Sequence, residues 1–472
     1  MSQTLTIHST ANITVSPYQF ERITEMQLVR PMNDHARITI SGIVAEEMLD
    51  KYVEQLEAGD QIEVKLREKN KETIIFRGPV TNMRVEAVRD VRSLTIEAYS
   101  STINMDVRKE SRSFQNKQMS YPQLFQRVMA GYSKSDFIDN ATGGKSIGSL
   151  LVQYQETDWM FLKRIASHFH APLVPVSSHA GIKFYIGLPD TGQPVKLDEY
   201  NYTVHKDLRD YQLKAENGVD GIDEHNSMNY TVMSYVWVEL GRAVQFHGRT
   251  LYVTRAESRI ENDVVIHIYE LKDRGGVQCR TAYCYELAGT SLFGEILDVA
   301  NDKVKLRLQI DQDQPVNESM WFPYSTVYSS PDGSGWYCMP EVGDEVRLYF
   351  PDEREKNAFA ASSVDKDSSD PARRSDPSVK SISTKYGKQV IFKPGSIEII
   401  ASGQLLMKLT DDGGIEINSD KKISLNAEED IEITGGAKIL LQGESGIEIV
   451  QANATMKIED EVTLSGGRVN IE

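Results

Sequence analysis

The sequence predicts a mainly β protein built from three parts in series, and three observations lead to this fold class. Residues 1–290 contain alternating apolar and polar runs with a few helical stretches, residues 291–364 contain short alternating runs at close spacing, and residues 381–472 repeat a unit of 8 residues. Alternation with a period of two predicts strands with one buried face. A longer fixed period predicts one structural unit that is stacked many times.

Strands dominate the prediction for residues 1–290. Residues 62–66 and 94–98 alternate between apolar and polar side chains, as half-buried strands do. One amphipathic stretch, residues 45–57, predicts a helix that ends before a glycine, which is a common stop signal. The apolar stripe of this helix consists of Met48, Tyr52 and Leu56.

Two further helices are predicted in the same part of the chain. Ser120 precedes a helix that runs to Ala130 and is followed by a glycine. Another helix begins near Thr157 and carries Asp158 in its first turn, where the helix dipole favours a carboxylate. One face of this helix is apolar and consists of Trp159, Leu162, Ile165, Ala166 and Phe169.

Residues 291–364 predict a small β barrel. Residues 304–310 alternate between apolar and polar side chains, and residues 346–350 repeat the pattern after a Gly-Asp turn. Several short strands in so short a stretch suit a five-stranded OB-type barrel. Residues 294–364 hold 6 basic and 13 acidic residues, so we expect a structural collar and no groove for a phosphate backbone. The polar residues 365–380, with two prolines, predict a linker.

The repeat in residues 381–472 consists of pairs of the form apolar-x-apolar, separated by Gly, Asn, Asp, Ser and Lys. Looser copies flank the regular ones, the last at Val469 and Ile471. Six pairs follow one another at a spacing of 8 residues, and we expect them to form the core of this part: Met407 and Leu409, Ile415 and Ile417, Ile423 and Leu425, Ile431 and Ile433, Ile439 and Leu441, Ile447 and Ile449.

One such unit buries little by itself. It exposes two apolar side chains and both edges of a short strand, so it must stack on neighbours to persist. A period of 8 with two inward residues suits a slender prism in which several chains wind about one axis. The alternative is a twisted antiparallel meander at the end of a monomer.

Composition narrows the possible partners and the compartment. The 472 residues include 52 basic and 69 acidic residues and carry a net charge of −17, which argues against nucleic acid as a main partner. Three cysteines, Cys279, Cys284 and Cys338, make no disulfide framework and predict reduced thiols in a protein made in the cytoplasm. The first residues lack the basic start and apolar core of a secretory signal, and no run approaches eighteen apolar residues.

Possible catalytic or metal-binding groups are few. His168, His170 and His179 lie close in sequence, but two residues apart on a helix point in different directions, and no third ligand follows at a recognisable spacing. We therefore expect helix-end surface histidines. Glu156 and Asp158 have the residue types of a glycosidase carboxylate pair, but their place at a helix start favours capping.

Residues 144–146, with the sequence GKS, have the end of a phosphate-binding loop motif, but Asp139 stands where the motif needs its first glycine. We expect an ordinary loop. The chain also contains no Gly-x-Ser-x-Gly elbow and no Cys/His pair at a known family spacing. The sequence thus predicts no enzyme, no cofactor and no metal site.

Three motifs carry a resemblance to a known family. Residues 154–165, YQETDWMFLKRI, closely resemble the Y-x-E-T-D-x-x-F-L-x-R-I/L signature of VgrG spikes of type VI secretion and their relatives in contractile phage tails. Residues 340–350 resemble the P-x-V-G-D-E-V-x-V-x-F segment of the family's barrel, and residues 386–392, YGKQVIF, resemble the entry to its needle. The residues that match the first two motifs are Glu156, Thr157, Asp158, Phe161, Arg164, Pro340, Gly343, Asp344 and Glu345.

The resemblance covers the whole chain and implies a fold class: a hub of barrel-like α+β domains, an OB-fold barrel and a C-terminal intertwined triple-stranded β-helix of octads. It implies a homotrimer whose hub (residues 1–290, two barrel-like subdomains) docks on a tail tube. Residues 291–364 would form a collar below the hub. After the linker 365–380, residues 381–472 would form a needle that punctures the target cell envelope.

The same resemblance implies assembly into a phage-tail-like particle, with inner tube and baseplate proteins as partners and a PAAR-like tip protein at the needle end. The linker is too short to hold the lysozyme domain of some phage relatives, and we expect no effector domain after Ile471. Two alternatives remain open, a tail-associated cell-wall hydrolase and a receptor-binding fibre. The needle contains no Trp, Tyr or Phe from residue 397 onward, which weakens the fibre hypothesis.

Overall fold

The computed structural model describes residues 7–468 except for positions 46, 48, 69, 70, 90, 312–315, 365–370, 403, 459 and 466. The predicted positions of Met48, Val469 and Ile471 therefore lie outside the described residues. The chain divides into two compact units, Met1–Lys366 and Asp367–Glu472. No helix in the described ranges is long and apolar enough to cross a membrane.

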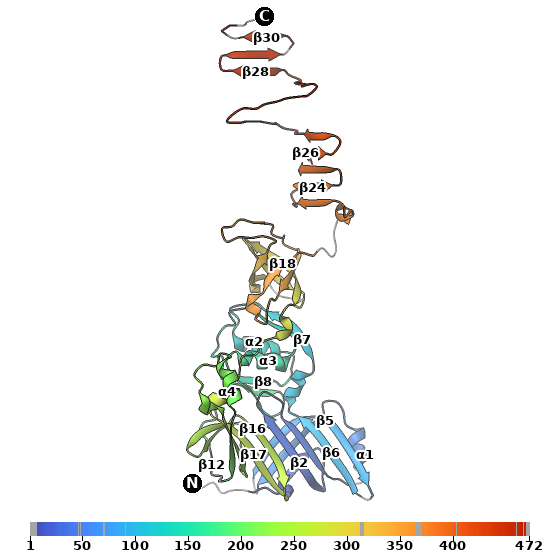
Figure 1. Cartoon of the computed structure of the whole chain (residues 1–472). Helices are drawn as coiled ribbons and strands as arrows, with labels where there is room; N and C mark the ends of the chain where they lie inside the picture. Colours follow the sequence, from blue (N-terminus) through green and yellow to red (C-terminus); the bar gives the residue numbers. More distant parts are fainter. Residues whose placement is uncertain are drawn as a thin grey trace. The chain divides into compact units, whose positions relative to one another are not determined.

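A large, mostly antiparallel sheet forms the base of the first unit, and Figure 1 shows β2, β5, β6, β16 and β17 side by side. Neighbouring strands in its main path are β1 (Ile13–Ser16), β4 (Gln61–Glu68), β5 (Lys71–Val88), β6 (Val91–Tyr99), β3 (Arg37–Ile43), β2 (Arg22–Pro31), β16 (Arg249–Glu261), β17 (Val264–Lys272), β14 (Met228–Ser234) and β13 (Tyr202–Lys206). Two more strands extend it beside β16: β15 (Ala243–Phe246) and β12 (Val195–Leu197).

The sheet has two halves with separate cores, and β16 and β17 contribute residues to both. In the first half, β3 buries every second residue, and Ile38 and Ile40 are fully buried among the side chains of β2, β4 and β6. A bridge between Ser9 and Val264 brings the start of the chain back to β17. The second half has its own core around Val244, Phe246 and Leu271. The alternation predicted for residues 62–66 and 94–98 is confirmed, because these residues lie in β4 and β6.

A smaller α+β layer lies between the large sheet and the strands that begin with β18 (Ser291–Ala300), as Figure 1 shows. Its elements are β7 (Lys109–Phe114), α2 (Tyr121–Met129), β8 (Asp136–Asp139), β9 (Leu151–Thr157), α3 (Asp158–Ser167), β10 (Leu173–Pro175) and β11 (Lys183–Ile186). Its core is aromatic: Trp159 meets Phe184 edge to face at 5.6 Å between ring centroids, and Phe114 stacks on Phe161. Short helices α4 (Leu208–Ala215) and α5 (Arg274–Val277) lie further along the chain.

Two of the predicted helices are confirmed and one is shorter than predicted. The Ser120 side chain caps α2, and Thr157 caps α3. Among the described residues of the predicted helix over residues 45–57, the α-helix is α1 (Leu49–Glu54), and Glu47 has 3-10 conformation. Tyr52 and Leu56 still pack against the core of the first half, so the apolar stripe is real although the helix ends early. A helix of six residues is too short to be stable by its own propensity, so packing against the core stabilises it.

The predicted five-stranded OB barrel is confirmed in the described residues as a closed barrel. Its strands pair in the order β18 (Ser291–Ala300), β19 (Lys303–Leu308), β20 (Trp321–Ser325), β22 (Phe359–Ala361) and β21 (Glu345–Tyr349), and β21 returns to β18. Val304, Leu306, Val346 and Leu348 point into it and are fully buried. We call these strands with their connections the barrel, and the part of the chain before β18 the hub.

The second unit consists of antiparallel meanders. The first contains β23 (Lys380–Ser383), β24 (Gln389–Lys393), β25 (Ser396–Ala401), β26 (Gln404–Thr410) and β27 (Gly414–Ile417). The second contains β28 (Ile447–Gln451), β29 (Ala454–Ile458) and β30 (Val462–Ser465). Residues 419–446 between them, all of them described, form no strand within this chain.

A buried basic pair lies where the two halves of the large sheet meet. The Arg30 guanidinium is fully buried, donates to the Val238 carbonyl oxygen at 2.9 Å and lies 3.7 Å from the centre of the Trp237 ring. His267, on the neighbouring β17, is also fully buried and bonds to Ser258 through Nδ1 at 2.7 Å. Burial, together with the charge of Arg30, lowers the pKa of His267 to about 3. The imidazole is therefore neutral in the folded hub.

This arrangement makes hub stability depend on pH. Because the folded pKa of His267 lies below its ordinary value of 6.5, its contribution is complete above about pH 6.5 and is lost as the pH falls toward 3. The full loss is on the order of 4–5 kcal/mol. We expect His267→Gln to flatten the fall of the thermal unfolding midpoint between pH 7.5 and 4.5. The matched control is His225→Gln, at an exposed histidine, and an equal effect of both substitutions would contradict the prediction.

Candidate functional site: the hub–barrel junction and the apolar face of the second unit

The signature over residues 154–165 forms the turn from β9 into α3. The hydroxyl oxygen of Thr157 accepts a hydrogen bond from the Met160 backbone N–H at 3.2 Å and so caps the helix. The prediction that Glu156 and Asp158 serve as caps is therefore wrong. Both side chains turn away from the free N–H groups of the helix because buried cations and donors lie close to them.

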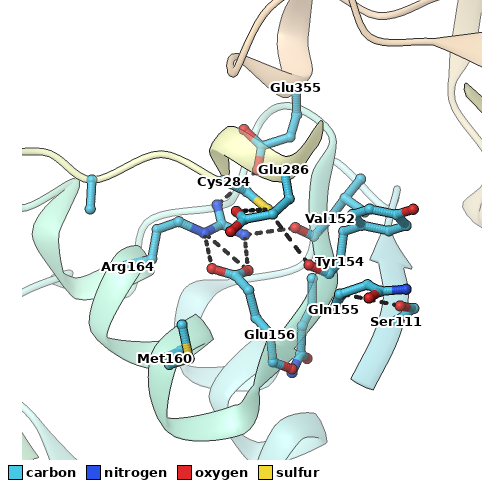
Figure 2. A network of polar contacts seen from close by, with 12 residues as sticks. Ser111, Val152, Tyr154, Gln155, Glu156, Met160, Arg164, Cys284, Glu286 and Glu355 are labelled. Carbon is cyan, nitrogen blue, oxygen red and sulfur yellow. Dashed lines mark hydrogen bonds and ion pairs between the residues drawn. The ribbon is translucent and has the colours of Figure 1, made fainter. Parts of the chain in front are cut away.

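Glu156 holds a buried arginine. Arg164, two turns further along α3, donates from Nε to both carboxylate oxygens of Glu156 at 2.9 and 3.1 Å, and from Nη2 to Oε2 at 2.7 Å. Nη2 also donates to the Val152 carbonyl oxygen at 2.7 Å, and Nη1 donates to Glu355 Oε1 at 2.8 Å. Figure 2 shows the guanidinium between the two carboxylates. The side chains of Arg164, Glu156 and Glu355 are 3, 9 and 6 % exposed.

The buried positive charge of Arg164 lies within hydrogen-bond distance of two buried carboxylates, Glu156 and Glu355. Burial by itself disfavours a charged Arg164, but the hydrogen bonds and charge of Glu156, together with the charge of Glu355, raise its pKa above the ordinary value. The desolvation cost of a buried ion pair offsets much of its attraction, so the pair positions elements more than it stabilises them. Glu355 belongs to the barrel, in a short 3-10 turn at Glu355–Asn357. One guanidinium thus fixes a helix of the hub to the barrel.

Asp158 organises the other side of the same turn. Its carboxylate accepts hydrogen bonds from Arg112, from Gln153 Nε2 at 2.9 Å and from the Tyr132 hydroxyl at 2.8 Å. Burial, followed by the bond to Asp158, raises the pKa of Tyr132 well above its ordinary value. Phe161, the apolar signature residue, is fully buried in the hub core. These signature residues therefore have structural roles: Thr157 caps α3, Phe161 lies in the core, and Glu156, Asp158 and Arg164 hold polar partners.

More contacts join the hub to the barrel. Asp311 of the barrel accepts from the Ser113 backbone N–H at 2.7 Å and from the Ser113 hydroxyl. Gln115 donates to the Leu306 carbonyl oxygen at 3.3 Å and accepts from the Met320 N–H at 3.1 Å. The barrel core also includes residues of the hub: Leu150, Val152, Cys284 and Leu287. Polar and apolar contacts together make the hub and the barrel one unit.

The second signature shapes the barrel at a different place. Gly343 has a φ of +94°, which favours glycine, and its N–H donates to the Ile296 carbonyl oxygen at 2.9 Å. Asp344 accepts from the Glu341 N–H at 2.9 Å, and Glu345 accepts from Gln309 Nε2 at 2.6 Å. Pro340 is half-buried just before this turn. These residues form the turn that leads into β21 and the start of that strand. They lie apart from the Arg164 cluster.

The predicted core residues of the repeat form an apolar face that the single chain leaves uncovered. Met407 lies opposite Ile399 and Ile417, and Leu409 lies opposite Ile397 and Ile415. In the second meander, Ile447 lies opposite Ile458 and Ile449 opposite Met456. Nine of the twelve residues, in the last strand of the first meander, in the stretch that follows it and in β28, are strongly exposed: Ile415 67%, Ile417 58%, Ile423 55%, Leu425 69%, Ile431 53%, Ile433 64%, Ile439 49%, Leu441 63% and Ile449 52%.

The histidines and the GKS segment have ordinary partners. His168 and His170 are half-buried at the end of α3, where Nε2 of His168 bonds to the Ala282 carbonyl oxygen and Nδ1 of His170 bonds to the Cys279 carbonyl oxygen, each at 3.0 Å. In the described ranges, no group of three or more His, Cys, Asp or Glu side chains could hold a metal ion. Residues 144–146 form a loop that bridges to Ser120.

Sequence reasoning missed the barrel's share of the junction. Glu355 and Asp311 lie about two hundred residues from their hub partners, and no spacing rule links residues at that separation. A weak signal was present in Glu355, which is an acidic residue beside the last barrel strand. A lone glutamate on a surface-like turn does not differ in sequence from a solvated one.

Replacing the shared cation tests the junction. Arg164→Met would leave Glu156 and Glu355 buried without a counter-charge, and we expect a loss of about 3–5 kcal/mol in unfolding free energy. Lys163→Met, at an exposed position on the same helix, should change it by less than about 0.5 kcal/mol. The measurement is denaturant unfolding by circular dichroism, with limited proteolysis between hub and barrel as a second readout. Equal stability and equal protease resistance of the two variants would contradict a coupling role.

Comparisons with known proteins agree with this architecture. The family model described as the type VI secretion system/phage-baseplate injector OB domain matches residues 293–364, and the model described as the Alg8 N-terminal domain matches residues 33–190. No curated protein sequence matches the chain.

Solved structures show the likeness of the fold. The E. coli c3393 protein, described as a type VI secretion component with structural similarity to the T4 bacteriophage tail proteins gp27 and gp5, is 12% identical, with a TM-score of 0.53 over 75% of this chain and 99% of that one. A half-lidded Francisella PdpA–VgrG complex is 9% identical, with a TM-score of 0.54 over 86% and 87%. The predicted resemblance is thereby confirmed: this chain has the fold of VgrG-like baseplate hub-and-spike proteins, and its residues 293–364 match the model of the injector OB domain.

Proposed function

We propose that the chain is the central spike of a contractile injection machine. Three copies would cap the inner tube at the baseplate, and their C-terminal parts would wind together into a needle that punctures the target envelope by force. The observation that carries this proposal is the uncovered apolar ladder of the second unit. A soluble chain seldom exposes a contiguous row of large apolar side chains unless a partner covers it.

Strand β25 of the first meander is inverted relative to an ordinary surface strand, because its charged member is buried and the apolar members on either side of it are exposed. Glu398 is 9% exposed and accepts two bonds from Lys393 Nζ at 2.8 Å, whereas its neighbours Ile397 and Ile399 are 38% and 36% exposed. Charged side chains are almost never the buried members of a strand when apolar ones are available. This inversion supports a partner that lies against the isoleucine side.

Residues 419–446 give stronger support for a partner that covers the apolar side chains. These residues hold three pairs of the repeat, at 423/425, 431/433 and 439/441, but form no strand within the described chain. Extended backbone needs hydrogen-bond partners, and strands from identical chains would supply them in the same register. Other copies would also cover the apolar side chains, each of which contributes about 25 cal/mol per Å² buried.

The junction suits a mechanical role. Force on a needle reaches the tube only through the connection between barrel and hub. A shared apolar core and the buried Arg164 cluster make this connection stiff. Packed interiors have low compressibility and transmit strain. The proposed partners are the inner tube and baseplate proteins at the hub and a PAAR-like tip protein at the needle end. The particle would be assembled from protein made in the cytoplasm.

Two other functions are less well supported. A cell-wall hydrolase needs a carboxylate pair or an activated nucleophile in a cleft, and Glu156 and Asp158 are instead engaged with Arg164 and Arg112. A receptor-binding fibre needs anchoring side chains on its surface, and the aromatic anchors favoured at interfaces do not occur after residue 397. Activity on peptidoglycan or tight binding to intact cells without the tail would favour these alternatives.

One substitution separates a wound needle from a monomer. Ile431 is 53% exposed in the single chain, so Ile431→Asp would be harmless in a monomer. In a three-chain needle it would place three carboxylates at one level of the axis. We expect loss of the trimer, or of its resistance to SDS without boiling, measured as mass by light scattering and by gel mobility.

The matched control is Ser424→Asp. Ser424 lies between Ile423 and Leu425, so in a strand of the proposed needle its side chain would point away from the apolar row, and the added charge is the same. This variant should keep a mass near three times 53.2 kDa. A wild-type monomer, or a trimer that tolerates Ile431→Asp as well as Ser424→Asp, would refute the intertwined needle.

A further inference from the structure

A second uncovered apolar surface lies on the barrel, away from the repeat. It is the connection that leaves β20 and turns back toward β21, here called the aromatic hairpin (residues 326–338). Its large side chains are strongly exposed: Val327 89%, Tyr328 53%, Trp336 57% and Tyr337 76%. Neither the junction nor the needle accounts for this cluster.

The aromatic hairpin is a built structure. The Trp336 N–H donates to the Tyr328 carbonyl oxygen at 2.8 Å, and the Thr326 hydroxyl donates to the Trp336 carbonyl oxygen at 2.7 Å. The Tyr337 hydroxyl donates to the Asn301 carbonyl oxygen at 3.0 Å and ties the hairpin to the turn between β18 and β19. Met339, directly after it, packs against the barrel core.

One glycine shows how closely the two arms approach. Gly335 has a φ of +142°, and a Cβ at this position would overlap the Tyr328 carbonyl oxygen. The backbone therefore presents the aromatic rings in one defined arrangement. Rigid aromatic side chains lose little entropy on contact, which is why Trp and Tyr dominate the strongest contacts at protein interfaces.

Charge favours a copy of the same chain as the occupant. The chain carries a net charge of −17, but residues 326–338 contain one acidic residue, Asp332, and no basic residue. Two copies would repel each other over most of their surfaces and least at this hairpin. An acidic or basic partner of another kind would find little to pair with here.

Tethering points to the same occupant. The linker of residues 365–380 spans at most about 55 Å when fully extended, so needles wound from several chains would keep their barrels close together. Linked modules of this kind meet at effective concentrations in the millimolar range, where modest apolar surfaces suffice for contact.

We infer that the aromatic hairpin is a contact between copies: Trp336 and Tyr337 of one barrel pack against the barrel of a second copy. The inference rests on the proposed trimer and adds to it an interface above the needle. It makes the collar a ring held by its own contacts, so that the needle does not have to hold the copies together alone.

A native thiol reports on this contact. Cys338 ends the hairpin and is exposed in the single chain, whereas Cys284 is buried and Cys279 is half-buried. The full-length protein is treated with a maleimide after its mass has been measured, and the modified cysteine is identified by peptide mass. We expect a trimer in which Cys338 reacts at least tenfold more slowly than in the same chain unfolded in guanidinium chloride.

The outcomes separate this inference from the proposed function. A monomer would overturn the trimer and the hairpin contact with it. A trimer in which Cys338 reacts at the unfolded rate would overturn only the hairpin contact. Protection that appears only after addition of bacterial outer-membrane vesicles would also overturn it, in favour of the target surface as the occupant.

A pair of variants guards against indirect effects. Tyr337→Ser should speed modification of Cys338 in the trimer at least fivefold, because it removes a side chain that covers the thiol at the contact. Tyr200→Ser removes a tyrosine that is 91% exposed in the hub and should leave the rate unchanged. Equal rates in both variants would overturn the inference, and the slow reaction of Cys284 in each shows that the fold is intact.

Discussion

A short strand with two apolar residues cannot persist alone, and this constraint governs the second unit. Each octad exposes its apolar pair on one face and two rows of backbone donors and acceptors at its edges. Within one chain, meanders satisfy part of this need at both ends of the unit, but residues 419–446 form no strand and their isoleucines are exposed. In the proposed trimer, strands from other chains would meet the rest of this need. The mass of the assembly would then be the central property of the protein, because stability and the proposed mechanical role would depend on the same contact.

The first unit solves a different problem, which is to join elements that lie far apart in sequence without movement between them. The Arg164 guanidinium donates to Glu156 from Nε and Nη2, to Val152 from Nη2 and to Glu355 from Nη1. Such a cluster restricts its own geometry, since each of the three guanidinium nitrogens donates to a fixed acceptor. The apolar core around Val152 and Leu287 excludes water from it. Glu156 and Asp158, which have the residue types of a catalytic pair, are engaged in ion pairs that hold the fold together. This agrees with a function that depends on shape and stiffness.

Much of the architecture was predictable because its signals are local. Alternation in residues 304–310 and 346–350 predicted barrel strands, and Ser120 and Thr157 predicted helix starts, because each pattern reports a period or a cap within a few residues. The helix predicted over residues 45–57 ends earlier than predicted, at Glu54. We attribute the difference to the packing of Tyr52 and Leu56 against the core, which local helix propensity does not describe. Glu156 and Asp158 failed as caps because their true partners, Arg164 and Arg112, reach them only after β7, β9 and α3 have packed together.

The sequence by itself determined the class of the protein: mainly β, an OB barrel, and a repeat of eight that one chain cannot bury. It did so because periodicity and composition are properties of neighbouring residues. Tertiary structure decided what the polar signature does. Glu355 and Asp311 meet hub residues almost two hundred positions away, and Trp336 and Tyr337 lie exposed on an ordered hairpin that no local pattern predicts. Long-range contacts and exposure depend on how elements pack, and no spacing rule within the chain records either of them.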